Sequence, residues 1–331
     1  MTWTIYPCYA VKLEEEYGLR IAVIGAGALG TVFGGFLARA GHDVDLLGRP
    51  WHLDRVAQEG LLIEGIWGEH RVSNCRVCTD LDQLSEGYDL VLFSVKSFDT
   101  AAVALQAKRA VGEGTLVLSL QNGLGNIETL AEIFGPTRCG AGRVIFGAEI
   151  IEPGRVRVTV CADDVVLGPV SPDAPNSERI RTVAELIRSA GIPCRYESEV
   201  QAYLWAKAIY NCALNPLGAL LGVNYGALAD RPETRAVINA VIREVFAVAV
   251  ARDVLLPWKT ADEYLNSFYG QLVPPTREHR PSMLQDLERG RRTEIEALNG
   301  RVVGYGREAS VSTPVNETIA NLIRFRGQTH G

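Results

Sequence analysis

A chemically capable pattern lies between residues 204 and 221, where an apolar stretch is interrupted every four residues by Lys207, Asn211 and Asn215. At 3.6 residues per turn, this spacing puts one amine and two amides on the same face of a helix. Burying such groups without partners costs roughly 1 to 3 kcal/mol each, and more for the charge, so a polar ligand would supply the partners. The alternative is a surface helix whose polar face is turned to water, although such faces normally carry several charges and this one carries a single lysine.

If this helix takes part in a reaction, a second reactant has to bind beside it. A glycine motif near the N-terminus indicates a bound dinucleotide. An apolar strand is expected at residues 19–24, a helix at residues 32–40 and a second strand at residues 42–47. Between the first strand and the helix, the pattern G-x-G-x-x-G is typical of a turn that holds the pyrophosphate of a dinucleotide at a helix N-terminus. The residues of this predicted cofactor site are Gly25, Ala26, Gly27, Ala28, Leu29 and Gly30.

The end of the second strand indicates which dinucleotide is bound. An NAD site usually has a carboxylate there for the ribose 2'-hydroxyl, whereas an NADP site has a cation for the 2'-phosphate. Asp45 is the rival candidate, but it precedes two leucines and is expected inside the sheet. Arg49 follows the strand directly, so we predict that it binds the 2'-phosphate and that the cofactor is NADPH.

Composition limits the class of protein. A chain of 331 residues, 47% hydrophobic and 22% charged, can form two domains with a sizeable core. Its net charge of -6 argues against nucleic acid as a partner, and no apolar run reaches the roughly 18 residues that a membrane helix needs. Residues 1–18 resemble a loosely attached extension more than a signal peptide, so we expect a cytoplasmic location.

The cysteines indicate neither a disulfide framework nor a metal. Their number is odd, seven, and they are scattered through the chain, as is usual for reduced thiols. Cys75 and Cys78 form the one close pair, but no histidine lies near further cysteines to complete a zinc site. We therefore predict no metal.

Strands and helices alternate up to about residue 196, as in an α/β Rossmann-type dinucleotide-binding domain over residues 19–196. Buried strands are expected at residues 89–95 and 115–120, and their polar ends place Lys96 and Asn122 at the edge of the sheet where ligands bind. A solvated lysine and a turn-forming asparagine are the alternatives. A hairpin signal at residues 152–154 predicts antiparallel strands, 143–151 and 156–160, that complete this sheet.

An all-α C-terminal domain is expected over residues 197–331. Helical periodicity covers residues 233–252, 261–272, 283–303 and 314–325. Ser282 and Gln285 have the spacing of a capping box at the start of the third of these helices, although a hydroxyl there also suits a substrate carboxylate. Glu294 is expected about three turns further along the same helix, where its charged neighbours Arg291, Arg292 and Glu296 favour a solvated position over a catalytic one.

Several segments together resemble the ketopantoate reductase (2-dehydropantoate 2-reductase) family over residues 19–326. Besides the glycine turn, they are NGLG at residues 122–125, LWAK at 204–207, NCALNPL at 211–217, PSMLQD at 281–286 and RTEIEALNG at 292–300. The resemblance implies NADPH-dependent reduction of ketopantoate to pantoate, on the route to pantothenate and coenzyme A. The chain departs from the family at Gly218, often threonine or serine, and at His279, asparagine in some members.

The resemblance implies a role for each polar residue of the site. Lys207 protonates the carbonyl oxygen as hydride arrives, and Glu294 pairs with this lysine or orients it. Lys96 and Asn122 contact the cofactor, and Asn122 also reaches the substrate. The remaining substrate-binding residues are Asn211 and Asn215, for hydroxyl or carbonyl groups, and Ser282, for the carboxylate.

Two other functions remain open at this stage. The first is the reduction of another branched or aromatic 2-keto acid, for example of the mandelate type. The second is a non-catalytic NADPH sensor, against which the presence of Lys207 argues. The expected partners are a small 2-keto acid and a second copy of the chain in a possible homodimer, with neither nucleic acid nor membrane.

Overall fold

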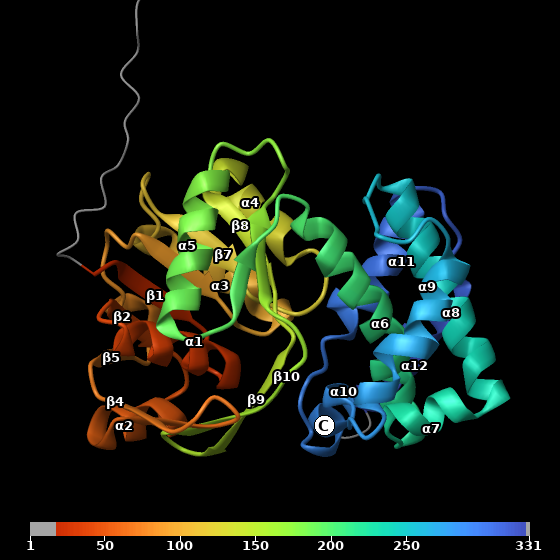
Figure 1. Cartoon of the computed structure of the whole chain (residues 1–331), viewed down its shortest axis with the longest axis horizontal. Helices are drawn as coiled ribbons and strands as arrows, with labels where there is room; N and C mark the ends of the chain where they lie inside the picture. The colour runs from red at the N-terminus through yellow and green to blue at the C-terminus, as the bar shows by residue number, and fades with distance from the viewer. Residues whose placement is uncertain (1–17, 329–331) are drawn as a thin grey trace, which may run out of the picture.

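The computed structural model describes residues 18–328, so the predicted N-terminal extension lies outside the described residues except for Gly18. The described chain divides into a half built on β-sheets and a half built of helices alone (Figure 1). The last strand ends at Tyr196 and the first helix of the other half begins at Val200. We propose the domain boundary at residues 196 and 197, because the chain changes there from sheet to helical packing.

The larger sheet has eight strands in the order β12-β11-β8-β7-β6-β1-β2-β5. The strands predicted at residues 19–24, 42–47, 89–95 and 115–120 are confirmed as β1, β2, β6 and β7, and they pair in parallel. Because β1 and β6 are neighbours, the polar residues that follow them meet at one edge of the sheet. The bounds are β1 Arg20–Ile24, β2 Asp43–Leu47, β5 Cys75–Cys78, β6 Leu90–Phe93, β7 Leu116–Ser119, β8 Cys139–Arg143, β11 Val165–Pro169 and β12 Cys194–Tyr196.

The predicted hairpin exists but does not complete this sheet. Its strands join a separate four-stranded sheet in the order β4-β3-β10-β9, so that part of the prediction is wrong. The chain leaves the larger sheet after Arg143, and Phe146 then packs against Phe33 and Trp67 on the other side of the first helix. The antiparallel neighbour of β8 is instead β11. The bounds are β3 Leu61–Gly65, β4 His70–Val72, β9 Phe146–Glu152 and β10 Arg155–Cys161.

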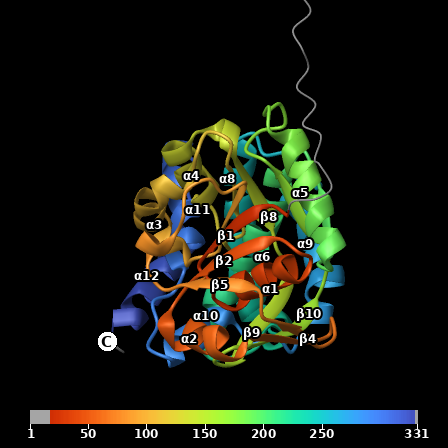
Figure 2. The same ribbon diagram turned by 90° about the vertical axis from the view of Figure 1, so that its left-hand side faces the viewer.

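Helices cover both faces of the larger sheet, with α1 and α5 on one face and α3 and α4 on the other (Figure 2). α1 is nearly all buried because the second sheet covers its outer side. The helices of this half are α1 Ala28–Arg39, α2 Pro50–Glu59, α3 Thr100–Gln106, α4 Asn126–Phe134 and α5 Ser177–Ala190, and the 3-10 turns are Leu81–Gln83, Ser97–Asp99, Ala107–Ala110 and Pro136–Arg138.

The helical half packs around α6, the helix that the polar stripe predicts. Its neighbours confirm the helices expected at residues 233–252, 261–272 and 314–325. The helices are α6 Val200–Leu221, α7 Tyr225–Asp230, α8 Pro232–Ala251, α9 Ala261–Ser267 continued by a π turn Phe268–Leu272, α10 Ser282–Glu288, α11 Asn299–Glu308 and α12 Pro314–Gln328, with 3-10 turns at Pro274–Thr276 and Ile295–Ala297. None of the helices within residues 18–328 combines the length and apolarity needed to cross a bilayer.

The single helix predicted over residues 283–303 is wrong. α10 ends at Glu288, and Gly290, with a φ of 61°, turns the chain out of the helix. A 3-10 turn and then α11 follow. Both helices bury apolar residues against the same core, so the helical periodicity continues across a break that the pattern does not reveal. Because of this break, Glu294 lies outside both α-helices, immediately before the 3-10 turn.

Pro216 interrupts the hydrogen bonding of α6 without ending the helix. Proline has no N–H, so the carbonyl of Cys212 one turn earlier has no donor from its own helix. The side chain of Asn299 at the start of α11 donates to this oxygen at 3.2 Å, and it also donates to Asn316 of α12 at 2.9 Å. One buried amide thus joins three helices and stabilises the part of α6 that carries the polar stripe.

Candidate functional site

Each glycine of the turn between β1 and α1 has its own steric reason. Gly25 has a φ of 105°, and a Cβ there would meet the backbone of Val95 at 2.5 Å. A Cβ on Gly30 would meet the hydroxyl of Ser94 at 2.5 Å, because α1 crosses close to the sheet. Gly27 differs, since the nearest atom to its Cβ position is 4.0 Å away and the residue is exposed. The turn therefore leaves room above Gly27 for a ligand.

The start of α1 offers hydrogen-bond donors in the same space. The helix begins at Ala28, and the first backbone bond from the turn into it joins Thr31 to the carbonyl of Gly27. The N–H groups of the first turn have no carbonyl of their own helix to bond, and they attract anions. No acidic side chain lies in this first turn. These features fit a pyrophosphate, so the turn can hold a dinucleotide.

Arg49 lies where the sequence predicts it, beyond the end of β2. It is exposed and immediately precedes α2, and its backbone is extended. The described residues include no hydrogen-bond or ion-pair partner for its side chain. Its guanidinium is available to a phosphate at the adenosine end of a dinucleotide.

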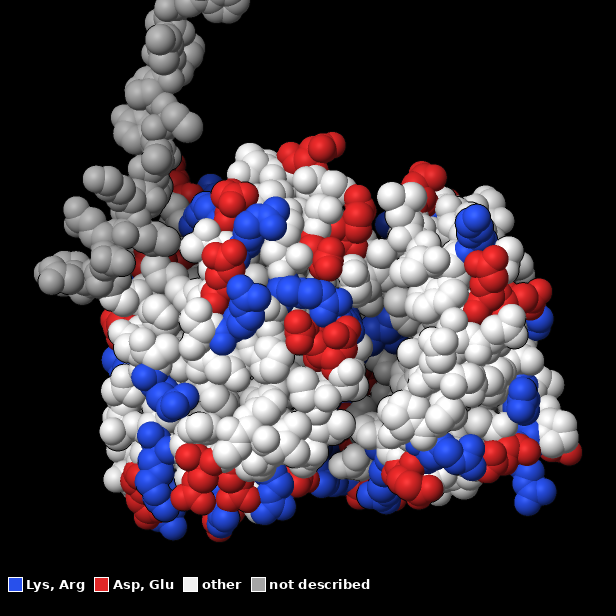
Figure 3. Space-filling view, viewed as in Figure 1, with Lys and Arg blue, Asp and Glu red and all other residues white. Residues whose placement is uncertain are grey.

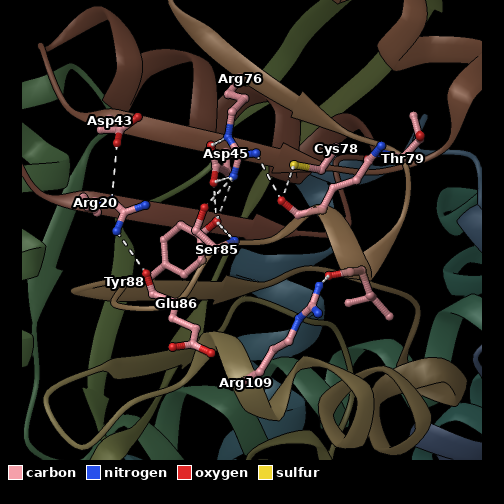
Figure 4. Close-up of polar contacts among 12 residues, drawn as sticks. Arg20, Asp43, Asp45, Arg76, Cys78, Thr79, Ser85, Glu86, Tyr88 and Arg109 are labelled. Carbon is pink, nitrogen blue, oxygen red and sulfur yellow. Dashed lines mark hydrogen bonds and ion pairs between the residues drawn. The ribbon is translucent and has the colours of Figure 1, made fainter.

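The carboxylate of Asp45, the rival candidate, is already bonded to other side chains. Its side chain is 4% exposed and binds the guanidinium of Arg76 on β5, with Nε at 2.6 Å from Oδ1. The hydroxyl of Tyr88 donates to the same carboxylate. Figure 4 shows the three side chains turned toward one another, and Arg76 also reaches Ser85 at 3.1 Å. The carboxylate thus ties the loop after β5 to the sheet, as expected for an aspartate inside the sheet.

Lys207 lies on α6 at the junction of the two domains. Its ammonium donates to the amide oxygen of Asn122 and to the carbonyl of Val144, both at 2.5 Å. The pKa of Lys207 is lowered to about 8, mainly by burial and also by the charge of Arg143, while Glu294 opposes the shift. Two of three N–H groups are thus engaged with neutral oxygens, and the third remains for a ligand.

Asn122 belongs to a loop that contacts both domains. The backbone of Leu124 donates to the carbonyl of Ala297 at 2.7 Å, and a Cβ on Gly123 would lie 2.6 Å from that same oxygen. Glycine is required here because its φ is 87° and the opposite domain is in contact. The Asn122 side chain, exposed at this junction, reaches Lys207. The space-filling view shows a furrow between the two halves with charged side chains inside it (Figure 3).

The rest of the polar stripe divides into two roles. Asn211 is partly exposed, and no hydrogen bond engages its side chain within the described part of the chain. Asn215 is buried; its amide oxygen accepts from the backbone N–H of Met283 at 3.0 Å and its nitrogen donates to the Ser282 hydroxyl at 3.1 Å. Asn215 therefore caps α10 from outside, and the predicted capping box is wrong because Ser282 lies inside the first turn, after Pro281. The Ser282 hydroxyl stays exposed.

Glu294 and Lys96 face each other across the domains. The lysine lies 3.2 Å from Glu294 and 3.2 Å from Asp286 of α10. Desolvation would lower the pKa of Lys96, but the two carboxylates outweigh it and the pKa is raised. Glu294 also accepts from the backbone N–H and hydroxyl of Ser97, at 3.1 and 3.0 Å. In this structure Glu294 thus bonds to Lys96 and Ser97, and it acts on Lys207 through its charge.

Sequence reasoning did not identify Ser97, Asp286 or Arg143. Ser97 directly follows Lys96 at the end of β6, so its position after a buried strand is a usable signal. Asp286 lies four residues after Ser282, one turn along the same helix. Arg143 ends a strand of small residues and has no spacing relative to Lys207 that sequence alone could interpret.

The two departures from the family pattern, Gly218 and His279, are packed against Pro281 and Tyr225. A Cβ on Gly218 would meet Pro281 at 2.6 Å, so a side chain there would displace the start of α10 and with it Ser282. The ring of His279 packs on Tyr225 at 5.0 Å, and burial lowers the pKa of His279.

Within residues 18–328, no group of three or more histidine, cysteine or acidic side chains could hold a metal ion.

Comparison with known proteins extends over nearly the whole described chain. The family description "Ketopantoate reductase PanE/ApbA" matches residues 21–172, and its C-terminal part matches residues 199–327. A 2-dehydropantoate 2-reductase of Aquifex aeolicus is 44% identical over 308 residues, 93% of this chain and 97% of the relative. A PanE/ApbA family ketopantoate reductase of Ralstonia eutropha JMP134 superimposes with a TM-score of 0.84 at 35% identity, covering 94% of this chain and 99% of that one.

A more distant structure shares the fold. D-mandelate dehydrogenase, solved with NADH and anilino(oxo)acetate, superimposes with a TM-score of 0.84 at 22% identity over 94% of this chain and 99% of that one. The two family matches together take in both domains and every residue of the site from Gly25 to Glu294. The chain therefore belongs to the ketopantoate reductase family of NAD(P)-dependent oxidoreductases.

Proposed function

We propose that this protein reduces 2-dehydropantoate to pantoate with NADPH, a step of pantothenate and coenzyme A biosynthesis. One observation carries the proposal: a half-buried lysine with a pKa of about 8 is bonded to Asn122 at the edge of the dinucleotide-binding sheet. Both the Aquifex relative and the Ralstonia structure carry the corresponding reductase name. Turnover of 2-dehydropantoate with NADPH, followed by the loss of nicotinamide absorbance, tests the proposal directly.

The cofactor site is argued from the open space above Gly27 and the free N–H groups at the start of α1. Gly25, Ala26, Gly27, Ala28, Leu29 and Gly30 would hold the pyrophosphate, with Arg49 at the 2'-phosphate and Lys96 and Asn122 toward the nicotinamide. When bound, NADPH supplies the hydride that reduces the carbonyl carbon. The chain itself has to place the carbonyl, stabilise the charge on its oxygen and provide a proton.

Lys207 can provide the proton. Its unengaged N–H can donate to the substrate oxygen, and because its pKa is near 8 the ammonium gives up that proton more readily than an ordinary lysine does. Asn122 and the carbonyl of Val144 hold the amine in place, which reduces the entropy lost on reaching the transition state. Glu294 orients Lys96 and favours the charged form of Lys207.

The substrate would lie along the polar stripe of α6. Among the described residues the amide of Asn211 has no hydrogen-bond partner, and it lies one turn after Lys207 on the same face of α6. We assign it to a substrate hydroxyl or carbonyl. The amide of Asn215 holds the Ser282 hydroxyl and the start of α10, so it positions the group that we assign to the substrate carboxylate.

The role of Arg49 predicts a cofactor-specific loss. Arg49→Ala should weaken NADPH binding by about 1 to 3 kcal/mol, the scale of a charge-assisted hydrogen bond, and leave NADH nearly unaffected. Titration of both cofactors by fluorescence or calorimetry measures this difference. Equal losses for the two cofactors would remove the assignment of Arg49 to the 2'-phosphate.

The role of Ser282 predicts a change in substrate affinity. Ser282→Ala should raise KM for ketopantoate at least about tenfold, which corresponds to roughly 1.4 kcal/mol. Ser282→Asp should raise KM further, because a carboxylate repels the substrate carboxylate. If the aspartate variant binds ketopantoate normally, the substrate carboxylate does not lie at this hydroxyl.

Another 2-keto acid is the second candidate, favoured by the shared fold with D-mandelate dehydrogenase. A panel of branched and aromatic 2-keto acids, assayed with NADPH, separates the two by kcat/KM. Ketopantoate should be reduced with the largest kcat/KM. A non-catalytic NADPH sensor would bind the cofactor and turn over none of the panel.

A cytoplasmic location and a homodimer stay predictions.

A further inference from the structure

A second cation, Arg143, lies one residue from the carbonyl that accepts the Lys207 ammonium, and it acts on that ammonium through its charge. Arg143 ends β8, and the carbonyl of the next residue, Val144, accepts the Lys207 ammonium. The side chain of Arg143 is only 5% exposed, although arginine is rarely buried without a structural or electrostatic reason. Its Nε atom is buried and finds no hydrogen-bond partner among the described residues. An incompletely bonded, buried guanidinium retains much of its electrostatic effect on neighbours.

The groups around Arg143 hold it in place from three directions. From the β10–β11 connection, Asp163 accepts from it at 2.7 Å and the carbonyl of Asp164 accepts at 3.1 Å. From α6, the ring of Tyr203 packs against the guanidinium at 5.4 Å, one turn before Lys207. From β12, Arg195 shares Asp163 at 3.1 Å and packs on the same ring at 5.5 Å. The cluster joins the sheet to the helix that carries the polar stripe.

The charges in this cluster are unequally screened. Asp163 is 44% exposed, Asp164 is 46% exposed and Arg195 is 32% exposed, so water weakens their effect at a distance. Glu197, which also pairs with Arg195, is 37% exposed. Among these charged side chains, Arg143 is the least exposed to water. Its electrostatic effect on Lys207 is therefore screened less than theirs.

Across the cleft, the charged groups act in the opposite direction. Glu294 favours the charged form of Lys207, but it is itself paired with Lys96 and Ser97. Asp286 is likewise paired with Lys96. Burial and the charge of Arg143 outweigh Glu294, and the pKa of Lys207 falls to about 8.

We infer that Arg143 is a positioning residue of this site, a buried cation that never touches substrate but makes the Lys207 ammonium readier to release its proton to the reduced carbonyl. The proton moves from Nζ of Lys207 to the new hydroxyl oxygen, and the neutral amine left beside Arg143 no longer suffers like-charge repulsion. The inference rests on the proposed function for its catalytic meaning, but the electrostatic effect itself can be measured without turnover.

The chain is well suited to a direct measurement because it contains five lysines: Lys12, Lys96, Lys108, Lys207 and Lys259. Protein grown with lysine labelled with carbon-13 at Cε gives a small set of NMR signals whose shifts report the titration of each amine. The signal that disappears in Lys207→Ala identifies Lys207. The midpoint measured for this signal in the unmodified chain, which we expect near pH 8, is the reference.

Arg143→Met should raise the midpoint of the Lys207 signal by about half a pH unit or more, because a buried positive neighbour is removed. Arg143→Lys keeps a positive charge, so the Lys207 midpoint should lie closer to that of the unmodified chain than it does in Arg143→Met. Arg195→Met is the matched control, since it loses contacts with the same aspartate and the same ring but carries the more exposed charge, and it should leave the midpoint in place. Arg143→Gln, which can still donate to Asp163, serves as the second variant if the methionine variant does not fold.

An unchanged midpoint in a folded Arg143→Met or Arg143→Gln variant overturns the inference, as does an equal shift in Arg195→Met. The alkaline limb of kcat/KM for ketopantoate should move upward with the same variants, because the acid must be protonated to act. Absence of ketopantoate turnover by the unmodified protein would instead overturn the proposed function. The two failures are therefore distinguishable.

Discussion

Lys207→Ala should lower kcat about 100-fold or more, with little change in NADPH affinity. The reason is that the ammonium interacts most strongly with an oxygen that has gained negative charge, which exists only as the hydride arrives. In the free protein the amine already bonds to Asn122 and Val144, so removing it costs few ground-state contacts with cofactor. Steady-state kinetics with ketopantoate, together with a direct titration of NADPH, separates the two effects.

Two variants control this experiment. Lys259→Ala removes an exposed lysine of the same domain and should leave kcat unchanged. Lys207→Arg keeps the positive charge, but arginine does not release a proton near neutral pH, so it should recover little of the lost rate. A Lys207→Ala variant with near-normal kcat would move the acid role elsewhere, and Lys96 would be the next candidate.

Removing Arg76 should destabilise the protein by about 3 kcal/mol, the largest stability effect that we expect from a single polar residue. Arg76→Leu leaves the Asp45 carboxylate, 4% exposed, with the Tyr88 hydroxyl alone as its strong partner. An uncompensated buried charge of this kind typically costs 3 to 5 kcal/mol. Because Arg76 is itself 47% exposed, we expect the lower end of that range. Urea unfolding followed by circular dichroism gives the change in free energy.

The matched control is Arg71→Leu, which removes an arginine that is 79% exposed and weakly paired at 4.0 Å. It should change stability by less than about 0.5 kcal/mol. A double variant, Asp45→Val with Arg76→Leu, should regain most of the loss, because no unpaired charge stays buried. Equal stability of the Arg76 and Arg71 variants would show that the carboxylate is not dependent on this pair.

Much of the site could be predicted because its elements carry local signals. The glycine spacing fixes where β1 ends and α1 begins, since only glycine accepts the backbone angle at Gly25 and the close helix crossing at Gly30. The four-residue spacing of Lys207 and Asn211 places them on one face of α6 because helix geometry depends on neighbouring residues alone. Apolar runs likewise predict the central strands of the larger sheet.

The partners of those side chains were decided by tertiary structure. Asn122 lies 85 positions from Lys207, and Glu294 lies 198 positions from the lysine that it pairs with. Ser282 is held by Asn215 of another helix rather than by its own capping box, and the hairpin after β8 joins a second sheet because Phe146 packs beyond α1. Periodicity is a property of short segments, whereas these contacts depend on how whole elements pack. The sequence by itself therefore determined the central strands, most of the helices and the polar face of α6, and domain packing determined which charges meet.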